Sequence, residues 1–142
     1  ERRMDHLRDE LLRKNLWNEE DNKVYEQVRS VMIHELENHN SKPSLLHGDL
    51  WGGNYMFLKD GRPALFDPAP LYGDREFDLG ITTVFGGFTQ EFYNEYEKHY
   101  PLGKGAEKRL EFYRLYLFMV HLVKFGGMYA SSVNRSMDQI LA

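Results

Sequence analysis

The middle of the chain holds three glycines within six residues, in the segment His47-Gly48-Asp49-Leu50-Trp51-Gly52-Gly53-Asn54. Glycine loses more backbone entropy on folding than any other residue, so this density excludes a stable helix there and predicts a tight loop. Any helices of the chain must therefore end before this segment or begin after it. We refer to residues 47–54 as the central loop.

Apolar side chains at helical spacing predict helices on both sides of the central loop. Before it, they predict a first helix from the start of the chain and a second over roughly residues 19–39. After it, they predict a short helix capped by Asp78, one capped by Thr89 and ending near Tyr100, one over residues 107–125, and a last one near residues 128–141.

Two short β-prone runs follow the central loop. Tyr55 to Lys59 and Pro63 to Phe66 flank Asp60-Gly61-Arg62, and an Asp-Gly pair is a strong hairpin signal. The segment from Asp67 to Gly80 is rich in proline, glycine and acidic residues, which predicts an irregular loop. The expected fold class is therefore mainly α (α+β), with one β-hairpin in the middle.

Length and composition restrict the function classes. At 142 residues the chain is at most one ordinary domain, and 42% hydrophobic residues are enough for a packed core. A net charge of −4 disfavours nucleic acid as a partner, and zero cysteines exclude disulfides and thiolate chemistry. No apolar run approaches the roughly 20 residues that span a bilayer, so we expect no membrane contact and a soluble, cytoplasmic protein.

The central loop contains the pattern H-x-D-x-x-x-x-N as His47, Asp49 and Asn54, and a further acid, Asp67, ends the second hairpin run. Phosphoryl transfer needs a carboxylate that orients the attacking hydroxyl group and oxygen ligands that hold Mg²⁺ against nucleotide phosphates. One loop and its adjacent hairpin supply that set of residues. The spacing therefore favours a kinase-type catalytic loop over a purely structural turn.

Two stretches carry a family resemblance: the central loop with the leucine before it, and Asp67-Pro68-Ala69-Pro70-Leu71-Tyr72-Gly73-Asp74-Arg75-Glu76-Phe77-Asp78-Leu79. They resemble the signature motifs of the fructosamine (ketosamine-3-) kinases, in the aminoglycoside-phosphotransferase and choline-kinase group of protein-kinase-like folds. Trp51 and the Asp-Pro-Ala start of the second motif narrow the match within this group to the fructosamine kinases. The resemblance covers residues 1–142 and implies the helical C-terminal lobe of that fold, with the N-terminal ATP-binding lobe absent.

The resemblance implies a function for the intact protein. It makes Asp49 the catalytic base and makes Asn54 and Asp67 the ligands of Mg²⁺, which is bound together with ATP. The implied reaction is phosphorylation of the 3-hydroxyl group of a fructosamine or other ketosamine, free or protein-linked, and hence protein deglycation. Without the ATP-binding lobe, we expect this chain to be inactive alone and able to self-associate through the exposed lobe interface.

Other residues of the two motifs have supporting or open roles. We expect His47 to be scaffold rather than a proton carrier, and Asp78 to be a helix N-cap that also steadies the loop backbone. Trp51 either stacks on the sugar or its amine or anchors the loop from below. An exposed loop accounts for Asp74, Arg75 and Glu76 as well as a substrate role does.

Alternatives remain at the level of the sequence. The acceptor could be another small alcohol of the aminoglycoside or choline type, or the chain could be a non-catalytic kinase-like binding domain. The aromatic residues Phe92, Tyr93, Tyr96 and Tyr100 are expected to be core, although the same region in related kinases lines the acceptor pocket. His34 and His39 are five residues apart, whereas a zinc-binding H-E-x-x-H motif needs four, so we expect a solvated helix end.

Overall fold

The computed structural model describes residues 2–142 and divides into two compact units. The helical unit comprises residues 2–40 and 111–142, and the loop unit comprises residues 41–110. The helix α5 (Ala106–Phe125) begins in the loop unit and continues into the helical unit. Most elements are helices and the strands are three residues long, which confirms the expected mainly α fold class.

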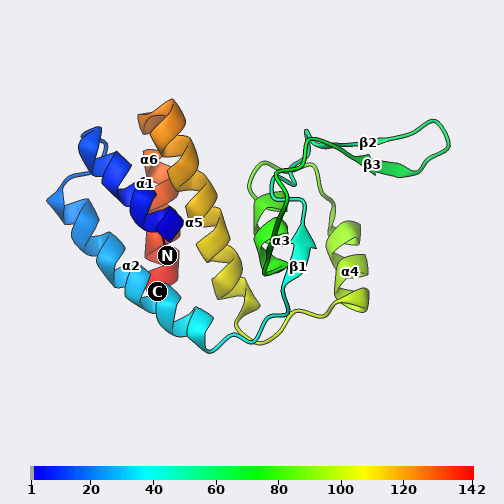
Figure 1. Ribbon diagram of the computed structural model, residues 1–142, viewed down its shortest axis with the longest axis horizontal. Helices are drawn as coiled ribbons and strands as arrows, with labels where there is room; N and C mark the ends of the chain where they lie inside the picture. The colour runs from blue at the N-terminus through cyan, green and yellow to red at the C-terminus, as the bar shows by residue number, and fades with distance from the viewer. Residues whose placement is uncertain (1) are drawn as a thin grey trace. The chain divides into compact units, whose positions relative to one another are not determined.

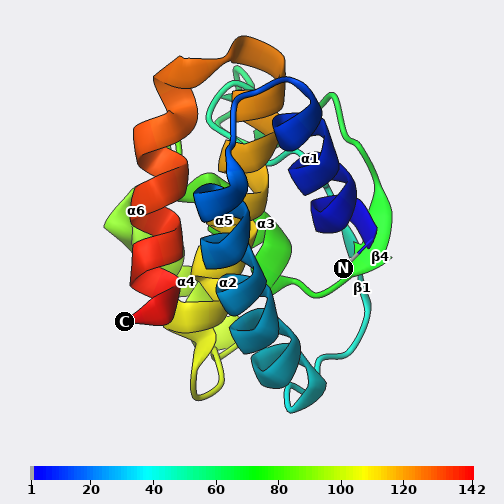
Figure 2. The same cartoon turned by 90° about the vertical axis from the view of Figure 1, so that its left-hand side faces the viewer.

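The helical unit consists of the predicted helices, which Figures 1 and 2 show at the two ends of the colour range. Besides residues 111–125 of α5, its elements are α1 (Arg2–Arg13), α2 (Glu19–Glu37), the 3₁₀ turn η1 (Gly127–Tyr129) and α6 (Ala130–Leu141). The start of α2 is fixed by a capping box, in which the Asn18 side chain accepts from the Asp21 backbone amide and the Asp21 carboxylate accepts from the Asn18 amide. These helices confirm the periodicity-based predictions.

The core of the helical unit is apolar. It is built from side chains less than a tenth exposed, which come from α1, α2, α5 and α6 and, in the case of Trp17, from the connection between α1 and α2: Met4, Leu11, Trp17, Tyr25, Val28, Met32, Phe112, Leu115, Met119, Leu122, Val133, Met137 and Ile140. Figure 2 shows α2 and α6 side by side. Burial of this apolar surface is the main stabilising term for the unit.

One polar cluster joins α1 to α2. The Asp5 carboxylate accepts from the Tyr25 hydroxyl at 3.1 Å and from Arg29 Nε at 2.9 Å. The hydrogen bond from Arg29 is the main reason why the pKa of Asp5 lies below its ordinary value. Burial, reinforced by the Asp5 charge, raises the pKa of Tyr25.

The loop unit contains two antiparallel strand pairs. The strand β2 (Tyr55–Phe57) pairs with β3 (Pro63–Leu65), which confirms the predicted hairpin. The strand β1 (Ser44–Leu46) pairs with β4 (Leu71–Gly73), so the prediction that residues 67–80 form an irregular loop is wrong for this part. The partner of β4 lies far away in the sequence, and a three-residue strand has no local pattern that reveals it.

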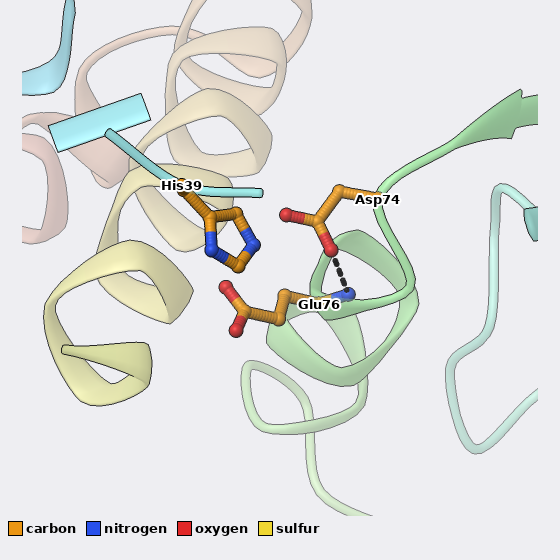
Figure 3. Close-up of side chains that lie close together, drawn as sticks. All are labelled: His39, Asp74 and Glu76. Atoms are coloured by element: carbon orange, nitrogen blue, oxygen red, sulfur yellow. Dashed lines mark hydrogen bonds between the residues drawn. The ribbon is translucent and has the colours of Figure 1, made fainter. Parts of the chain in front are cut away.

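Two short helices complete the loop unit, α3 (Glu76–Thr82) and α4 (Gln90–His99), both visible in Figure 1. Thr89 occupies the predicted N-cap position of α4, but its side chain makes no capping hydrogen bond to the helix backbone. The start of α3 differs from the prediction, because the helix begins two residues before Asp78. The Asp74 carboxylate accepts from the Glu76 backbone amide at 3.0 Å and so starts the helix earlier (Figure 3).

A buried ion pair fastens α3 to the start of α5 within the loop unit. The Arg109 guanidinium donates to both carboxylate oxygens of Glu76, at 2.8 and 2.7 Å. The Arg109 side chain is 4% exposed and that of Glu76 is 2% exposed, so the charges are compensated away from water. The expectation that Glu76 lies in an exposed loop is therefore wrong.

The β2–β3 hairpin carries exposed apolar side chains. Met56, Phe57 and Leu65 are 53%, 66% and 60% exposed. Figure 1 shows the hairpin extending away from α3 and α4 of the same unit. Among the described residues, no helix combines the length and the apolar character that crossing a membrane requires.

Candidate active site

The central loop connects β1 to β2 and turns sharply at its second residue. Gly48 has a φ of 82°, in the left-handed region that favours glycine. A Cβ atom at this position would lie 1.9 Å from the backbone oxygen of Ala69. The Ala69 amide also donates to the His47 oxygen at 2.8 Å, so the segment after β3 lies directly against the start of the loop.

His47 uses both of its ring nitrogens inside this structure. Its Nδ1 accepts from the Asp49 backbone amide at 3.3 Å, and its Nε2 is 2.9 Å from the Phe66 backbone oxygen. A backbone amide can only donate and a carbonyl oxygen can only accept, so the proton of the neutral ring belongs on Nε2. The ring therefore links the loop to the end of the hairpin, an arrangement that supports a scaffold role.

Asp49 and Asn54 are held together across the loop. Asn54 Nδ2 donates to the Asp49 backbone oxygen at 2.8 Å and to Asp49 Oδ2 at 3.1 Å. Asn54 is only 6% exposed, whereas Asp49 is half-buried. The amide nitrogen of Asn54 is thus committed to Asp49, and its Oδ1 is the atom that can serve as a ligand.

Asp67 follows β3, and the hydrogen bonds of the preceding residue, Phe66, connect this part of the chain to Asn54 and His47. The Phe66 amide donates to the Asn54 backbone oxygen at 3.1 Å, and the Phe66 oxygen accepts from His47. Asp67 itself is exposed and has a φ of 49°, which is uncommon for a residue other than glycine. Such backbone conformations cluster at functional sites, where the surrounding structure fixes them.

Asp78 holds the backbone of the central loop from α3. Its Oδ2 accepts from the His47 amide at 2.7 Å, and its Oδ1 accepts from the Gly48 amide at 2.9 Å. The prediction that Asp78 caps a helix is wrong, because the residue lies inside the first turn of α3. The carboxylate instead accepts from loop amides about thirty positions away in the sequence. This agrees with the expectation that Asp78 steadies the backbone of the central loop.

Trp51 lies on the surface of the loop. Its side chain is 41% exposed, it covers Gly53, and it meets the Phe85 ring edge-on with the centroids 6.4 Å apart. The alternative in which Trp51 is a buried anchor is therefore wrong. The Trp51 side chain is thus partly exposed two residues after Asp49.

The loop unit contains a cavity of about 310 Å³. It is lined by β1, α3 and α4 side chains, including Asp78, Arg75, Phe92, Tyr96 and Tyr100. No residue of α4 is buried, so the expectation that its aromatic residues are core is wrong. They form a ladder of ring contacts along one helix face, and the Arg75 guanidinium lies 5.6 Å from the Tyr96 ring centroid.

Comparison with known proteins shows where the chain belongs. The model of the family described as Fructosamine kinase matches residues 1–142. The chain belongs to the fructosamine kinase family. A relative in Staphylococcus aureus named "Probable ketoamine kinase" is 74% identical over 99% of this chain and 49% of its own length. The mouse protein named "Ketosamine-3-kinase" is 47% identical over 63% of this chain and 29% of its own length.

Solved structures give the same family likeness. A candidate fructosamine-3-kinase from Thermobifida fusca matches 95% of this chain and 46% of its own, with a TM-score of 0.82 and 28% identity. One from Haemophilus somnus matches 84% of this chain and 40% of its own, with a TM-score of 0.71 and 32% identity. The expected helical lobe of a kinase-like fold is confirmed, and the chain spans about half the length of the curated relative from Staphylococcus aureus.

Proposed function

We propose that the protein carrying this chain transfers a phosphoryl group from Mg·ATP to the 3-hydroxyl group of a ketosamine. The observation that carries the proposal is the pair of hydrogen bonds from Asn54 Nδ2 to Asp49, which fixes a carboxylate and an amide on one loop. The names of the relatives from Staphylococcus aureus and mouse support a ketosamine acceptor. The motif spacing supports the phosphoryl-transfer chemistry.

Asp49 is the catalytic base in this proposal. An Asp49 carboxylate oxygen accepts the proton of the acceptor hydroxyl group as the hydroxyl oxygen attacks the γ-phosphorus of ATP, and the bond from that phosphorus to ADP breaks. Because the transition state of phosphoryl transfer is loose, orienting the hydroxyl group matters more than strong basicity. The hydrogen bond from Asn54 restrains Oδ2 of Asp49, and the Asp78 and His47 contacts restrain the backbone that carries it.

Asn54 and Asp67 fit a magnesium site by their chemistry. Mg²⁺ prefers carboxylate and carbonyl oxygens, and Asn54 Oδ1 with the exposed Asp67 carboxylate supplies such donors. When bound, the ion neutralises charge on the phosphates of ATP. Trp51 is proposed to contact the acceptor with its exposed ring face.

The decisive experiment is Asp49→Asn in the intact protein, assayed with ATP and a fructosyl-lysine acceptor by phosphorus NMR. We expect turnover to fall by about 10²–10⁴-fold, the usual contribution of a general base. The matched control is Asp60→Asn, because Asp60 is an exposed aspartate of the hairpin turn that pairs only locally with Arg62. The control should leave turnover unchanged.

Two outcomes would overturn parts of this proposal. Turnover of Asp49→Asn within about threefold of wild type would refute its role as base. Phosphate appearing only on an aminoglycoside or on choline, offered in parallel, would refute the ketosamine acceptor. A normal thermal unfolding midpoint for the variant would show that any loss of turnover is not caused by unfolding.

We also propose that this chain alone self-associates, as expected for an exposed lobe interface, and that the β2–β3 hairpin takes part because Met56, Phe57 and Leu65 are each more than half exposed. Sedimentation velocity across a concentration series should show association that Phe57→Lys weakens. Leu45→Lys, which changes a similarly exposed residue (65%) on β1, is the control. A monomer at all concentrations would contradict the proposal.

A further inference from the structure

A turn of two glycines lies against the second half of the central loop. Residues 85–88, Phe-Gly-Gly-Phe, connect α3 to α4, and we refer to them as the GG turn. Gly86 and Gly87 have φ values of 73° and 93°, in the region that only glycine adopts readily. The chemistry proposed for the loop gives this turn no role.

The turn and the loop meet backbone to backbone. A Cβ atom on Gly87 would lie 2.7 Å from Gly52 Cα, and one on Gly52 would lie 3.1 Å from Gly87 Cα. The neighbours at these distances are main-chain atoms, so they cannot move aside as the end of a side chain would. The absence of side chains at both positions is therefore what allows the two segments to approach.

Side chains fasten the same contact on both flanks. The Tyr55 hydroxyl donates to the Gly87 oxygen, and the Tyr55 ring packs against Phe88 with the centroids 5.1 Å apart. On the other flank, Phe85 contacts Trp51. Trp51 and Tyr55 bracket residues 52–54, so the GG turn is attached at both ends of the segment that includes Asn54.

We propose that the GG turn is a positioning element for Asn54, acting through the Gly87–Gly52 contact and the Tyr55 hydroxyl. The inference rests on the proposed function, in which Asn54 is a metal ligand. The first half of the loop, with Asp49, is anchored separately by Asp78 and by the ring of His47. Asp49 therefore has anchors besides Asn54, and we expect a disturbance of the turn to act on Asn54 first and to reach Asp49 through the hydrogen bonds from Asn54 Nδ2.

Gly87→Ala in the intact protein tests the contact. We expect the half-saturating Mg²⁺ concentration to rise about tenfold and kcat to fall by roughly 10–100-fold, because small displacements of a positioned ligand have large effects. Independently of activity, hydrogen exchange of the Asn54 amide, which donates to the Trp51 oxygen at 2.9 Å, should accelerate by about tenfold.

Gly61→Ala is the matched control. Gly61 has a similar φ of 83° in the β2–β3 turn, but a Cβ atom there would meet nothing within 4 Å. The two variants therefore share the backbone strain and differ in the contact with the loop. Equal effects of Gly87→Ala and Gly61→Ala on Mg²⁺ dependence and Asn54 exchange would overturn the inference.

A second pair of variants, with milder substitutions, tests the same contact in case Gly87→Ala fails to fold. Tyr55→Phe removes the hydroxyl that holds the Gly87 oxygen, whereas Tyr93→Phe removes a hydroxyl that bonds Thr82 Oγ1 at 3.0 Å in the same unit. We expect Tyr55→Phe alone to raise the half-saturating Mg²⁺ concentration, by about threefold, and to accelerate Asn54 exchange. Indistinguishable results for the pair would refute the inference.

The assay separates this inference from the proposed function. If Asp49→Asn abolishes turnover while Gly87→Ala and Tyr55→Phe match their controls, only the positioning role is wrong. If Asp49→Asn retains turnover, the proposed function fails, and the exchange of the Asn54 amide still decides whether the turn positions that residue.

Discussion

The helical unit and the loop unit differ in the balance of apolar and polar interactions that stabilise them. In the helical unit, apolar side chains from α1, α2, α5 and α6 fill one core. In the loop unit, charged and polar side chains bond to backbone groups, as Asp78 does with two loop amides, and Glu76 pairs with Arg109 in a buried position. Apolar burial is non-directional, whereas these bonds fix individual atoms. The candidate site lies in the loop unit, where directional hydrogen bonds position individual atoms.

The largest effect should come from separating the buried pair of the loop unit. Arg109→Met leaves the Glu76 carboxylate buried without its guanidinium partner, which should cost about 3–5 kcal/mol of unfolding free energy. Hydrogen exchange resolved over residues 41–110 during denaturant titration measures this loss. The double variant Glu76→Leu with Arg109→Met should recover more than half of it, and a double variant as unstable as the single one would contradict the charge argument.

A somewhat smaller effect should follow from a cavity in the helical unit. Leu115 is fully buried, and Leu115→Ala should cost about 2–5 kcal/mol, depending on how far the core relaxes. Leu141→Ala, at a residue 39% exposed on α6, is the control and should change stability little. Chemical denaturation followed by exchange in residues 111–142 is the measurement. A loss as small as that of the control would show that this core is not the main support of the unit.

The smallest effect should come from the polar cluster of the helical unit. The native pKa of Asp5 is lowered, so its contribution to stability is present above the unfolded pKa of about 3.9 and is lost as the pH falls through the native pKa. Asp5→Asn should cost below about 1 kcal/mol at pH 7, because the pair is partly exposed. Unfolding free energies measured between pH 7 and pH 3 should fall less steeply for the variant. Parallel curves would contradict this assignment.

The same contrast explains which features were predictable from the sequence. The helices are predictable because apolar periodicity is a local signal. The strand β4 was missed because its partner β1 is distant in the sequence. The pairing of Glu76 with Arg109 joins residues 33 positions apart, so no local sequence pattern reveals it.

For the candidate site, the motif identified the residues but not what each one contacts. The spacing of Asp49 and Asn54 suggested a shared role, and the structure joins them by hydrogen bonds. The partners of Asp78 could not be read from its position near a helix start, because a carboxylate there can bond either to the local amides or to distant ones. The positioning role proposed for the GG turn has no local signal in the sequence, because it depends on which backbone segment the turn contacts.

Any side chain at Gly48 would clash with the Ala69 oxygen, and this clash predicts which family sequences can form the loop. In a saturation mutagenesis library, every substitution at this position should be depleted, alanine included, whatever the chemistry of the new residue. A family sequence that keeps the aspartate and the asparagine but carries a side chain at the position of Gly48 should therefore be classed as a pseudoenzyme candidate. A search that tests only the ionisable residues would overlook it.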